Sequence, residues 1–567
     1  YLDIYLTGGD IRDMLYHNNG NGTFTEVGIA AGLSLTDSIS TMGVITGDID
    51  NDGYRDVFVT TWIDEHNLLF KNNGDGTFQE ISASAGISDT ALSTAASFGD
   101  FNLDGFLDIY VVNYIDPSKP PTDDSGFYYT CSPNYLYMNN GNETFSEVAS
   151  LYGVADTGCG LATAFTNYDQ DSDVDIYIAN DFGAWVLPNS LYQNNYPSPD
   201  FSNVSVSSSM NDAIYGMGIA IGDYDEDGDL DYYVTNLGRN VLRNNQGNGL
   251  FIDLTDSAGV ANTYTDSNLF AVGWGTAFLD YDNDTYLDLF VVNGHIPADS
   301  IIANAPANPD VLYKNNGDAT FTDLSASLGV DDTSMARGFA YGDYDNDGDL
   351  DLLIMVADTG LTSSHALLYQ NNNSNNNHWL KVKLQGTINN RDAYGSLVRI
   401  VSNGRNWIRE IDGGSSHLSH HSAIAHFGLG TYTTVDTIEV TWPDGKSQFL
   451  SNIGIDTTIL IVEDTAITGY TTQIRNLQSE IDCYPNPFTK HITISYHLME
   501  NTYVKLQVYD IMGRKIKSLA DEFQSAGDHI IIWDGTNDKG INGRAGFYIC
   551  KMERGGMIIY KKIFFIK

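Results

Sequence analysis

Loops rich in aspartate recur six times at a fixed spacing in the first two thirds of the chain. Each loop has nine residues, with carboxylate or amide side chains at positions 1, 3, 5 and 9. A loop that curls once aims alternate side chains at its own centre, and glycine at position 6 allows the sharp turn. Hard carboxylate and carbonyl oxygens are the ligands that Ca²⁺ prefers. The spacing therefore predicts about six calcium sites, with strands instead of EF-hand helices on either side.

The expected ligands are Asp48, Asp50, Asp52 and Asp56; Asp100, Asn102, Asp104 and Asp108; Asn167, Asp169, Asp171 and Asp175; Asp223, Asp225, Asp227 and Asp231; Asp280, Asp282, Asp284 and Asp288; and Asp343, Asp345, Asp347 and Asp351. The third loop has Asn167 at position 1 and Ser172 at position 6, and the fifth has Thr285 at position 6. We expect these two sites to bind more weakly. We also expect the ions to be structural, holding hairpins in place, rather than to bridge a ligand or take part in catalysis.

The acidic loops belong to a longer repeat, which must position them. A Gly-rich apolar run precedes the loop, as at 217–222, and a β-branched and aromatic strand follows it, as at 108–112. A third strand (67–71), an Asn-Gly and Asp-Gly turn (72–76) and a fourth strand (77–81) complete the unit. The closing aspartates fall at 3, 56, 108, 175, 231, 288 and 351. Four antiparallel strands per unit predict a propeller of seven blades, the first cut by the start of the chain, and a parallel solenoid is the structural rival.

The composition narrows the possible functions. Hydrophobic residues make up 42% of the 567 residues, and the net charge of −46 repels nucleic acids and anionic membranes. No apolar run is long enough to predict a membrane span. The first residue is Tyr1, which is consistent with a mature or truncated chain. Cys131 and Cys159 form a disulfide or remain two buried thiols, and nothing in the sequence pairs Cys483 with Cys550.

Three segments resemble known families. The acidic loops, the strands after them and the Asn-Asn-Gly-Asp-Gly-Thr-Phe turn at 72–78 resemble the FG-GAP/VCBS repeats of integrin α-subunit propellers. Gly273-Trp274-Gly275-Thr276, Asn293-Gly294-His295, His426-Phe427-Gly428-Leu429-Gly430 and Trp442-Pro443-Asp444-Gly445 are similar to the ASPIC/UnbV group, which includes the cartilage acidic proteins. Leu397-Val398-Arg399 departs mildly from that group's usual Ala-Arg-Val. Tyr484-Pro485-Asn486-Pro487-Phe488, Trp533-Asp534-Gly535 and the basic end resemble the type A C-terminal sorting domain of the type IX secretion system.

These resemblances imply an all-β architecture. We expect an integrin-α-like propeller at 1–372, a β-rich ASPIC/UnbV domain at 378–462, a linker at 463–482 and an immunoglobulin-like sandwich at 483–567. The sorting domain implies export through the periplasm of a Bacteroidota-type bacterium, with the secretion machinery as a partner. The protein is then expected outside the cell or on the outer-membrane surface.

A ligand is expected on the rim opposite the acidic loops, where the long connections after the second strands lie. The candidate ligand-face residues there are Trp62, His66, Tyr128, Tyr129, Asp181, Trp185 and His295. A second cluster, His417, His420, His421 and His426, has ligand types suited to Zn²⁺ or Cu²⁺, but no nearby cysteine supports a site. We therefore do not favour a metal there.

Three functions are compatible with these features. The first is a binding or adhesion module for a protein or glycan ligand at the cell surface. The second is an exported polysaccharide lyase or hydrolase, since propellers also host enzymes. The third is a surface or filament subunit that self-associates through open blade edges. The sequence has no nucleophile elbow, zinc-protease motif or isolated carboxylate pair outside the acidic loops, so we expect a binding protein and not an enzyme.

Overall fold

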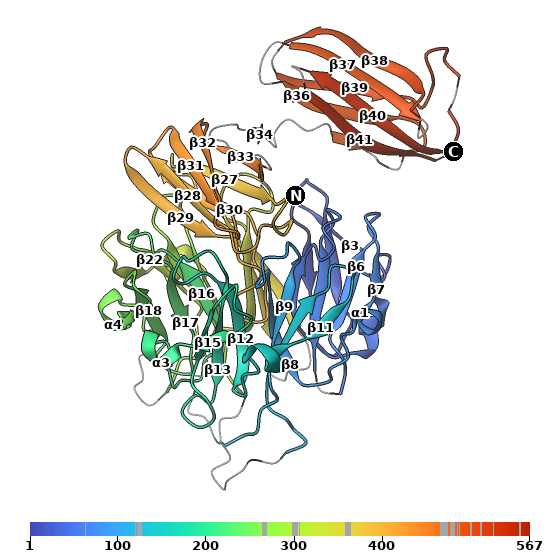
Figure 1. Cartoon of the computed structure of the whole chain (residues 1–567). Helices are drawn as coiled ribbons and strands as arrows, with labels where there is room; N and C mark the ends of the chain where they lie inside the picture. The colour runs from blue at the N-terminus through green and yellow to red at the C-terminus, as the bar shows by residue number, and fades with distance from the viewer. Residues whose placement is uncertain are drawn as a thin grey trace. The chain divides into compact units, whose positions relative to one another are not determined.

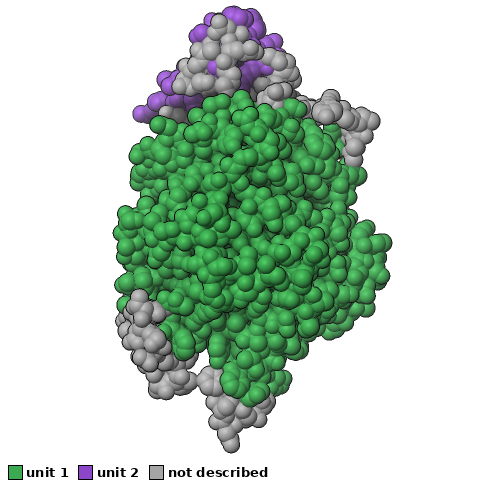
Figure 2. Space-filling model, turned by 90° about the vertical axis from the view of Figure 1, so that its left-hand side faces the viewer, with its two compact units in different colours: residues 1–456, 461–473 green, residues 457–460, 474–567 purple. Residues whose placement is uncertain are grey.

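The regular secondary structure of the computed structural model is almost entirely β-strand, with a few short helices, which confirms the predicted all-β class (Figure 1). It describes the chain except residues 63, 120, 122–127, 264–268, 298–303, 305–306, 358–363, 465–473, 477–481, 485, 487, 499–501, 511–512, 526, 542, 555–556 and 567. Most of the predicted linker and parts of the sorting motifs therefore lie outside the described residues. The chain divides into two compact units, residues 1–456 with 461–473 and residues 457–460 with 474–567 (Figure 2).

The first part of unit 1 contains successive antiparallel sheets in chain order, and adjacent sheets contact each other through their first strands. The first is β1-β2-β3 (Ile4–Leu6, Met14–Asn18, Phe24–Glu26). Four-stranded sheets follow: β4–β7 (Thr41–Gly47, Asp56–Thr61, Leu68–Asn72, Phe78–Glu80), β8–β11 (Ser93–Gly99, Asp108–Asn113, Tyr135–Asn139, Phe145–Glu147), β12–β15 (Cys159–Thr166, Asp175–Asp181, Ser190–Asn194, Phe201–Asn203), β16–β19 (Ile219–Gly222, Asp231–Val234, Val241–Asn245, Phe251–Asp253) and β20–β23 (Gly273–Leu279, Asp288–Asn293, Val311–Asn315, Phe321–Asp323). The last is β24-β25-β26 (Met335–Gly342, Asp351–Ala357, Ser364–Tyr369).

This arrangement is a β-propeller built from the predicted repeat. Every residue of the second strands β5, β9, β13 and β21 is buried, which explains their β-branched and aromatic composition. The first sheet differs from the others. Its strand β1 comes directly after Asp3, which corresponds to the closing aspartate of an acidic loop, so β1 corresponds to the second strand of a four-stranded sheet. Among the described residues this sheet therefore has three strands, with none that corresponds to a first strand. The count of seven blades stays a prediction.

Short helices follow the fourth strands. They are α1 (Ser82–Ala85), α2 (Ala149–Tyr152), α3 (Ser205–Ser208), α4 (Thr255–Ala258) and α5 (Ser325–Leu328), and a 3₁₀ helix, η1, spans Leu33–Ser38. Each α-helix ends at a residue in the left-handed region, which is glycine except at Ser209. These helices lead the chain back to the first strand of the next sheet.

The second part of unit 1 is a smaller β domain. One sheet has the order β29-β28-β31-β32 (Arg405–Glu410, Leu397–Ser402, Val435–Thr441, Ser447–Ile453), and in the other β30 (Ala425–Gly430) pairs with β27 (His378–Gln385). Two further strands, β33 (Thr457–Val462) and β34 (Ile474–Asn476), follow along the chain. Between β29 and β30, residues 411–424 form what we call the plug loop. It pairs with first strands of the propeller, Gly413 with Phe98 and Ser416 with Ile219. The plug loop thus lies along the inner strands of the ring.

Unit 2 contains two sheets around a core of its own. Their orders are β35-β36-β39 (Asp482–Tyr484, Ile492–Leu498, Gly527–Trp533) and β38-β37-β40-β41 (Lys515–Gln524, Thr502–Asp510, Gly546–Arg554, Met557–Phe565). Ile494, Val508 and Trp533 are fully buried in this core. Cys483 and Cys550 are both buried in this core as thiols, and the contact with Cys483 together with burial raises the pKa of the Cys550 thiol. The immunoglobulin-like assignment stays a prediction.

Candidate metal centres and candidate ligand face

The first acidic loop shows how the repeat positions its carboxylates. Asp48 accepts main-chain hydrogen bonds from Asp52 (3.0 Å) and Gly53 (2.7 Å), and Asp56 accepts one from Ile49 (3.0 Å). The bond from the sixth residue to the first recurs at Gly105–Asp100, Gly228–Asp223, Thr285–Asp280 and Gly348–Asp343. These bonds fix the first and last aspartates at the base of the loop, so their side chains are held beside the acidic residues between them.

Position 6 adopts the same left-handed backbone in every loop, whatever its side chain. Gly53 has φ 97° and Gly348 also has φ 97°, while Ser172 has 86° and Thr285 has 93°. Side chains disfavour this region, so the third and fifth loops keep the turn at an energetic disadvantage that glycine avoids. The departures seen in the sequence therefore leave the left-handed backbone at position 6 unchanged.

Four of the loops bring three carboxylates together. Their ligand atoms lie within 4.8 Å of one another in the groups Asp48–Asp50–Asp56, Asp223–Asp225–Asp231, Asp280–Asp282–Asp288 and Asp343–Asp345–Asp347. Three of the four predicted ligands thus meet in the first, fourth, fifth and sixth loops. The second and third loops, all of whose residues are described, do not reach this spacing with three acidic groups.

Unpartnered oxygens in these loops fit a hard cation. Asp223 Oδ1 and Asp225 Oδ1 in the fourth loop and Asp282 Oδ1 in the fifth are buried without a hydrogen-bond partner. Leaving a buried polar atom unsatisfied costs about 1–3 kcal/mol, and more for a charged group. A divalent ion held by these oxygens would remove that cost. The residues present therefore suit a metal such as Ca²⁺.

Burial and mutual repulsion also perturb the carboxylates. Desolvation, with repulsion from neighbouring aspartates, raises the pKa of Asp48 to about 6, of Asp100 to about 7 and of Asp280 to about 8. The ionised forms are therefore unfavourable while no positive charge lies between them. A bound cation would favour the ionised forms.

The aspartates at position 7 of the acidic loops were not among the predicted metal ligands. Asp173 is buried with an unpartnered Oδ1, and desolvation, followed by the charges of Asp171 and Asp169, raises its pKa to about 8. Asp349, at the same position, accepts a 2.8 Å hydrogen bond from Asn283 of the preceding loop. The recurrence of aspartate at position 7 was visible in the sequence, but its role in joining neighbouring loops was not.

The second β domain of unit 1 covers the rim that the acidic loops form. Asp392 accepts a 2.7 Å hydrogen bond from the main chain of Asp48, and the Trp407 indole donates one of 2.9 Å to Glu226. Contacts at other loops join Glu410 to Asn167 and Lys381 to Asp343. Because this domain lies on the loops, the rim is an internal interface, which agrees with a structural role for bound ions.

The four histidines predicted as a less favoured metal cluster belong to the plug loop and to β30. His417 Nδ1 lies 2.7 Å from the carbonyl of Met217, and His426 Nε2 lies 2.9 Å from that of Gly348. Burial lowers the pKa of His417 to about 4 and those of His420, His421 and His426 to about 3. The metal-type groups found among the described residues contain only aspartates, and His417 and His426 contact main-chain carbonyls of the propeller.

On the opposite rim, the loops after β9 and β13 gather aromatic side chains. The rings of Tyr128 and Trp185 meet edge to face with centroids 5.5 Å apart. Phe182 contacts Tyr129 at 4.8 Å and Tyr215 at 5.8 Å. We call the aromatic cluster the set Tyr114, Tyr128, Tyr129, Phe182, Trp185 and Tyr215. The structure thus brings Tyr128, Tyr129 and Trp185 together as one surface feature.

Asp181 lies at the base of the aromatic cluster. The Tyr114 hydroxyl donates a 2.5 Å hydrogen bond to it, and burial raises the pKa of Asp181 to about 6. The next residue, Phe182, has φ 56°, which turns the chain so that its ring enters the cluster. Tyr114, Phe182 and Tyr215 were not selected from the sequence, because aromatic residues in connecting loops give no sign of which loops meet.

Three of the predicted ligand-face residues belong neither to the aromatic cluster nor to its base at Asp181. Trp62 and His66 are in the loop after β5, and Trp62 lines a large cavity beside β1. His295 is in the loop after β21, where its carbonyl accepts a hydrogen bond from Arg337.

A disulfide joins Cys131 to Cys159, with Cα atoms 5.3 Å apart, and so ties the loop after β9 to β12. This decides the alternative that the sequence left open.

Comparisons with known proteins identify the same three segments. Residues 1–59, 48–111 and 297–354 match the FG-GAP-like repeat, residues 386–468 match ASPIC and UnbV, and residues 482–567 match the secretion system C-terminal sorting domain. The chain therefore contains these three kinds of module. The sorting domain indicates export by type IX secretion in Bacteroidota, to the cell surface or the extracellular space. In the described part of the chain, every helix is too short or too polar to cross a bilayer.

Cartilage acidic protein 1 is a relative in sequence. The Homo sapiens protein is 25% identical over 421 residues, which cover 71% of this chain and 60% of the relative, and the Mus musculus protein is also 25% identical over 421 residues, covering 71% and 62%. The chain thus spans about 60% of the length of the human relative.

The likenesses to solved structures are distant. An Agrocybe aegerita lectin has a TM-score of 0.36 at 15% identity, covering 66% of this chain and 90% of the lectin. The V. cholerae biofilm matrix protein Bap1 has a TM-score of 0.31 at 12% identity, covering 93% and 73%. We base no argument on these two structures.

Proposed function

We propose that this protein is a calcium-loaded binding module that holds a protein or glycan ligand at the bacterial cell surface. The aromatic cluster is the observation that carries the proposal. Tyr128 and Trp185 are 39% and 37% exposed although their rings pack together. Tyrosine and tryptophan supply much of the binding energy in interfaces, and loops on a rigid scaffold are the usual place for them. Export by the sorting domain puts this surface outside the cell.

Calcium in the acidic loops supplies the rigid scaffold in this proposal. The carboxylates of the first, fourth, fifth and sixth loops are already close together, and they offer the oxygen ligands that Ca²⁺ prefers. The second β domain lies over the loops, so bound ions would stabilise both the hairpins and that interface. They would have no direct contact with a ligand on the opposite rim.

Binding is favoured over turnover by the chemistry of the cluster. A hydrolase or lyase needs converging acid, base or nucleophilic groups around the reacting atoms. Asp181, the carboxylate that we place at the base of the aromatic cluster, is buried with its Oδ2 bonded to Tyr114. We therefore propose a non-catalytic role for this surface.

The experiment compares ligand capture by the full chain and by matched tryptophan variants. We would screen a glycan array and cell-surface protein extracts with the wild type, then repeat the positive arm with Trp185→Ala and Trp62→Ala. These tryptophans are 37% and 43% exposed, but only Trp185 belongs to the aromatic cluster. We expect Trp185→Ala to weaken binding at least about tenfold and Trp62→Ala to leave it unchanged. Equal binding by all three proteins would contradict the proposed face, and turnover of a polysaccharide would favour the enzyme.

Self-association is a second candidate, because β1 is an edge strand of its sheet. A cavity of about 1590 Å³ lies beside it, lined in part by Tyr5, Val44 and Phe339. Open edges accept strands from other molecules. Sedimentation velocity and electron microscopy would show concentration-dependent oligomers, and Leu6→Lys in β1 should reduce them while Thr25→Lys in β3 should not. A monomer at all concentrations would exclude this candidate.

A further inference from the structure

One strand position lies next to the acidic loop of its own sheet. It is the residue before the asparagine that ends the third strand, such as Lys314 before Asn315. The side chain at this position contacts a loop carboxylate in the pairs Lys71–Asp50, Gln193–Asp169, Asn244–Asp225, Lys314–Asp282 and Gln370–Asp345. The charge of this contact residue therefore differs between loops that are otherwise alike.

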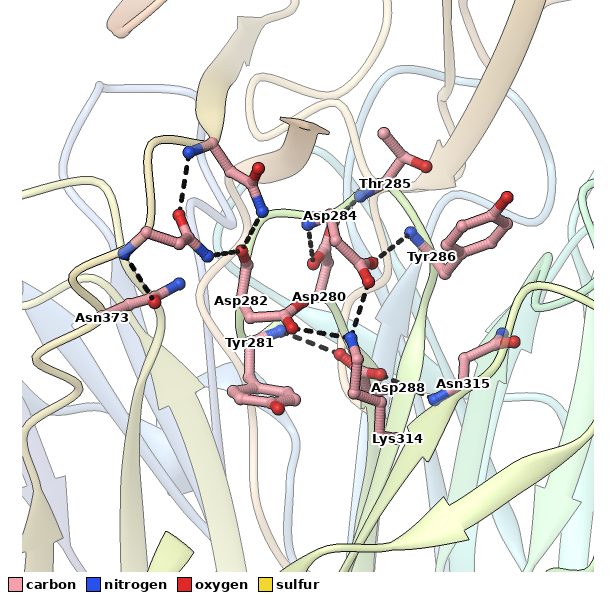
Figure 3. A network of polar contacts seen from close by, with 12 residues as sticks. Asp280, Tyr281, Asp282, Asp284, Thr285, Tyr286, Asp288, Lys314, Asn315 and Asn373 are labelled. Carbon is pink, nitrogen blue, oxygen red and sulfur yellow. Dashed lines mark hydrogen bonds and ion pairs between the residues drawn. The ribbon is translucent and has the colours of Figure 1, made fainter. Parts of the chain in front are cut away.

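In the fifth loop the contact residue is a cation. Lys314 Nζ donates hydrogen bonds of 2.6 Å to Asp282 Oδ2 and of 2.6 Å to Asp284 Oδ2, and Figure 3 shows the ammonium between these two carboxylates. It also lies 5.4 Å from the centroid of the Tyr281 ring. Asp282 belongs to the three-carboxylate group of this loop. The ammonium is thus bound by oxygens that would otherwise hold a metal ion.

The fourth loop has the same acidic positions but a neutral contact residue. Asn244 donates hydrogen bonds to Asp225 Oδ2 (2.9 Å) and Asp231 Oδ1 (3.0 Å). Asp223 Oδ1 and Asp225 Oδ1 remain buried without a partner, and Asp223 is only 3% exposed. An amide adds no charge to a group of carboxylates. The contact residue therefore supplies a positive charge to the carboxylates of the fifth loop and none to those of the fourth, although Asp282 Oδ1 in the fifth loop is also without a hydrogen-bond partner.

We propose that Lys314 is the resident cation of the fifth acidic loop, so this loop keeps its shape without a divalent ion while the fourth loop binds one. The proposal rests on the calcium loading proposed above for the other loops. Lys314 and Asn244 occupy equivalent positions in neighbouring sheets. The identity of this one residue then decides which of these two loops takes up calcium.

The proposal is tested by exchanging the two residues in the full chain. The wild type, Lys314→Asn, Asn244→Lys and the double exchange would be stripped with a chelator, and bound Ca²⁺ counted by equilibrium dialysis at saturation. We expect Lys314→Asn to bind one more ion than the wild type and Asn244→Lys to bind one fewer. The double exchange should return to the wild-type count. A Lys314→Asn protein that is folded in calcium and gains no ion would overturn the proposal.

A measurement on the wild type covers the case in which a variant fails to fold. Acetylation of lysines, followed by peptide mass spectrometry, reports whether Lys314 leaves the loop. Its side chain is 23% exposed, and that of Lys119, at 57%, serves as a reactive reference. We expect Lys314 to stay poorly labelled with and without Ca²⁺. Labelling that rises to the level of Lys119 when calcium is added would show that the ion displaces the lysine.

These measurements separate the inference from the proposed function. They contain no ligand, so a failure of ligand capture leaves the ion counts unchanged. If the wild type and Lys314→Asn both bind no ion, both the calcium loading and the role of Lys314 are wrong. If the wild type binds calcium and the exchange has no effect, only the role of Lys314 is wrong.

Discussion

The side chain of Asn18 donates a 2.8 Å hydrogen bond to the main-chain carbonyl of Tyr344, 326 residues further along the chain. Asn18 ends β2, which corresponds to the third strand of the four-stranded sheets. Tyr344 is the second residue of the sixth acidic loop. The same bond links neighbouring sheets elsewhere, as from Asn194 to Phe101 (2.8 Å). The first and last sheets are therefore joined by the same contact that links each sheet to the next from β4–β7 to β24–β26.

We predict that Asn18→Ala weakens this junction. Asn18 is 4% exposed, and its amide also donates to the carbonyl of Leu2. Its removal leaves these two half-buried carbonyls without this donor, so we expect a loss of about 1–3 kcal/mol in the free energy of unfolding. Asn19→Ala is the control. In the described structure the exposed Asn19 amide donates its hydrogen bond to the nearby Thr23 and reaches no other sheet. Urea denaturation measures both, and equal stabilities would contradict the prediction.

Removing calcium should lower the melting temperature. A ligand present at 100 times its dissociation constant stabilises the folded state by about 2.7 kcal/mol per site, and this is lost on chelation. Differential scanning calorimetry with EGTA, and again after calcium is restored, measures the effect. Magnesium, which demands stricter octahedral geometry, is the control and should restore little. A melting temperature unaffected by EGTA, with no calcium uptake, would exclude the ions.

His417 should make unfolding sensitive to pH. Burial, and then the charge of Arg337, lower its pKa to about 4, while Trp274 packs against the ring. The unfolded chain, with a histidine pKa near 6.5, binds more protons between about pH 6.5 and 4. Stability is then lost as the pH falls through this window, by at most about 1.4 kcal/mol per unit. His417→Asn should remove that part of the slope in urea titrations, whereas His17→Asn, at an exposed site, should not.

Reduction of the Cys131–Cys159 disulfide should destabilise the ligand-face loop. The sequence separation of 28 residues predicts a contribution of about 3–4 kcal/mol from the loop that the bond closes. The double variant Cys131→Ser/Cys159→Ser should melt earlier and be cleaved faster by protease within 114–130. Cys483→Ser is the control, since that residue lies in unit 2. Thiol titration of the exported protein that finds all four cysteines reduced would contradict this assignment.

Thr285→Gly should stabilise the fifth loop. Thr285 has φ 93°, and its buried Oγ1 has no hydrogen-bond partner. Glycine removes both disadvantages, so we expect a gain of about 1 kcal/mol in chemical denaturation. The reverse change in the first loop, Gly53→Thr, should cost at least as much. A loss of stability on Thr285→Gly would show that the packing of the buried Thr285 side chain matters more than the backbone conformation.

Local patterns could be predicted because their causes lie within a few residues. The turn at 72–76 and the nine-residue loops depend on glycine, asparagine and aspartate at fixed spacings, and the structure shows the expected bonds, such as Gly53 to Asp48. The contact of Lys314 with Asp282 could not be predicted in this way. It depends on the register between β21 and β22, which brings residues 32 apart in the chain together.

The sequence by itself determined the all-β class, the repeat with its acidic loops and the three modules, because strand alternation and turn chemistry are written in short segments. Only the tertiary structure decided that a second domain covers the acidic rim, that the plug loop lies along the inner strands and that Tyr128, Trp185 and Phe182 share one face. Loops that meet in space carry no common period in the chain. Their contacts follow from the closure of the ring, which packs residues hundreds of positions apart.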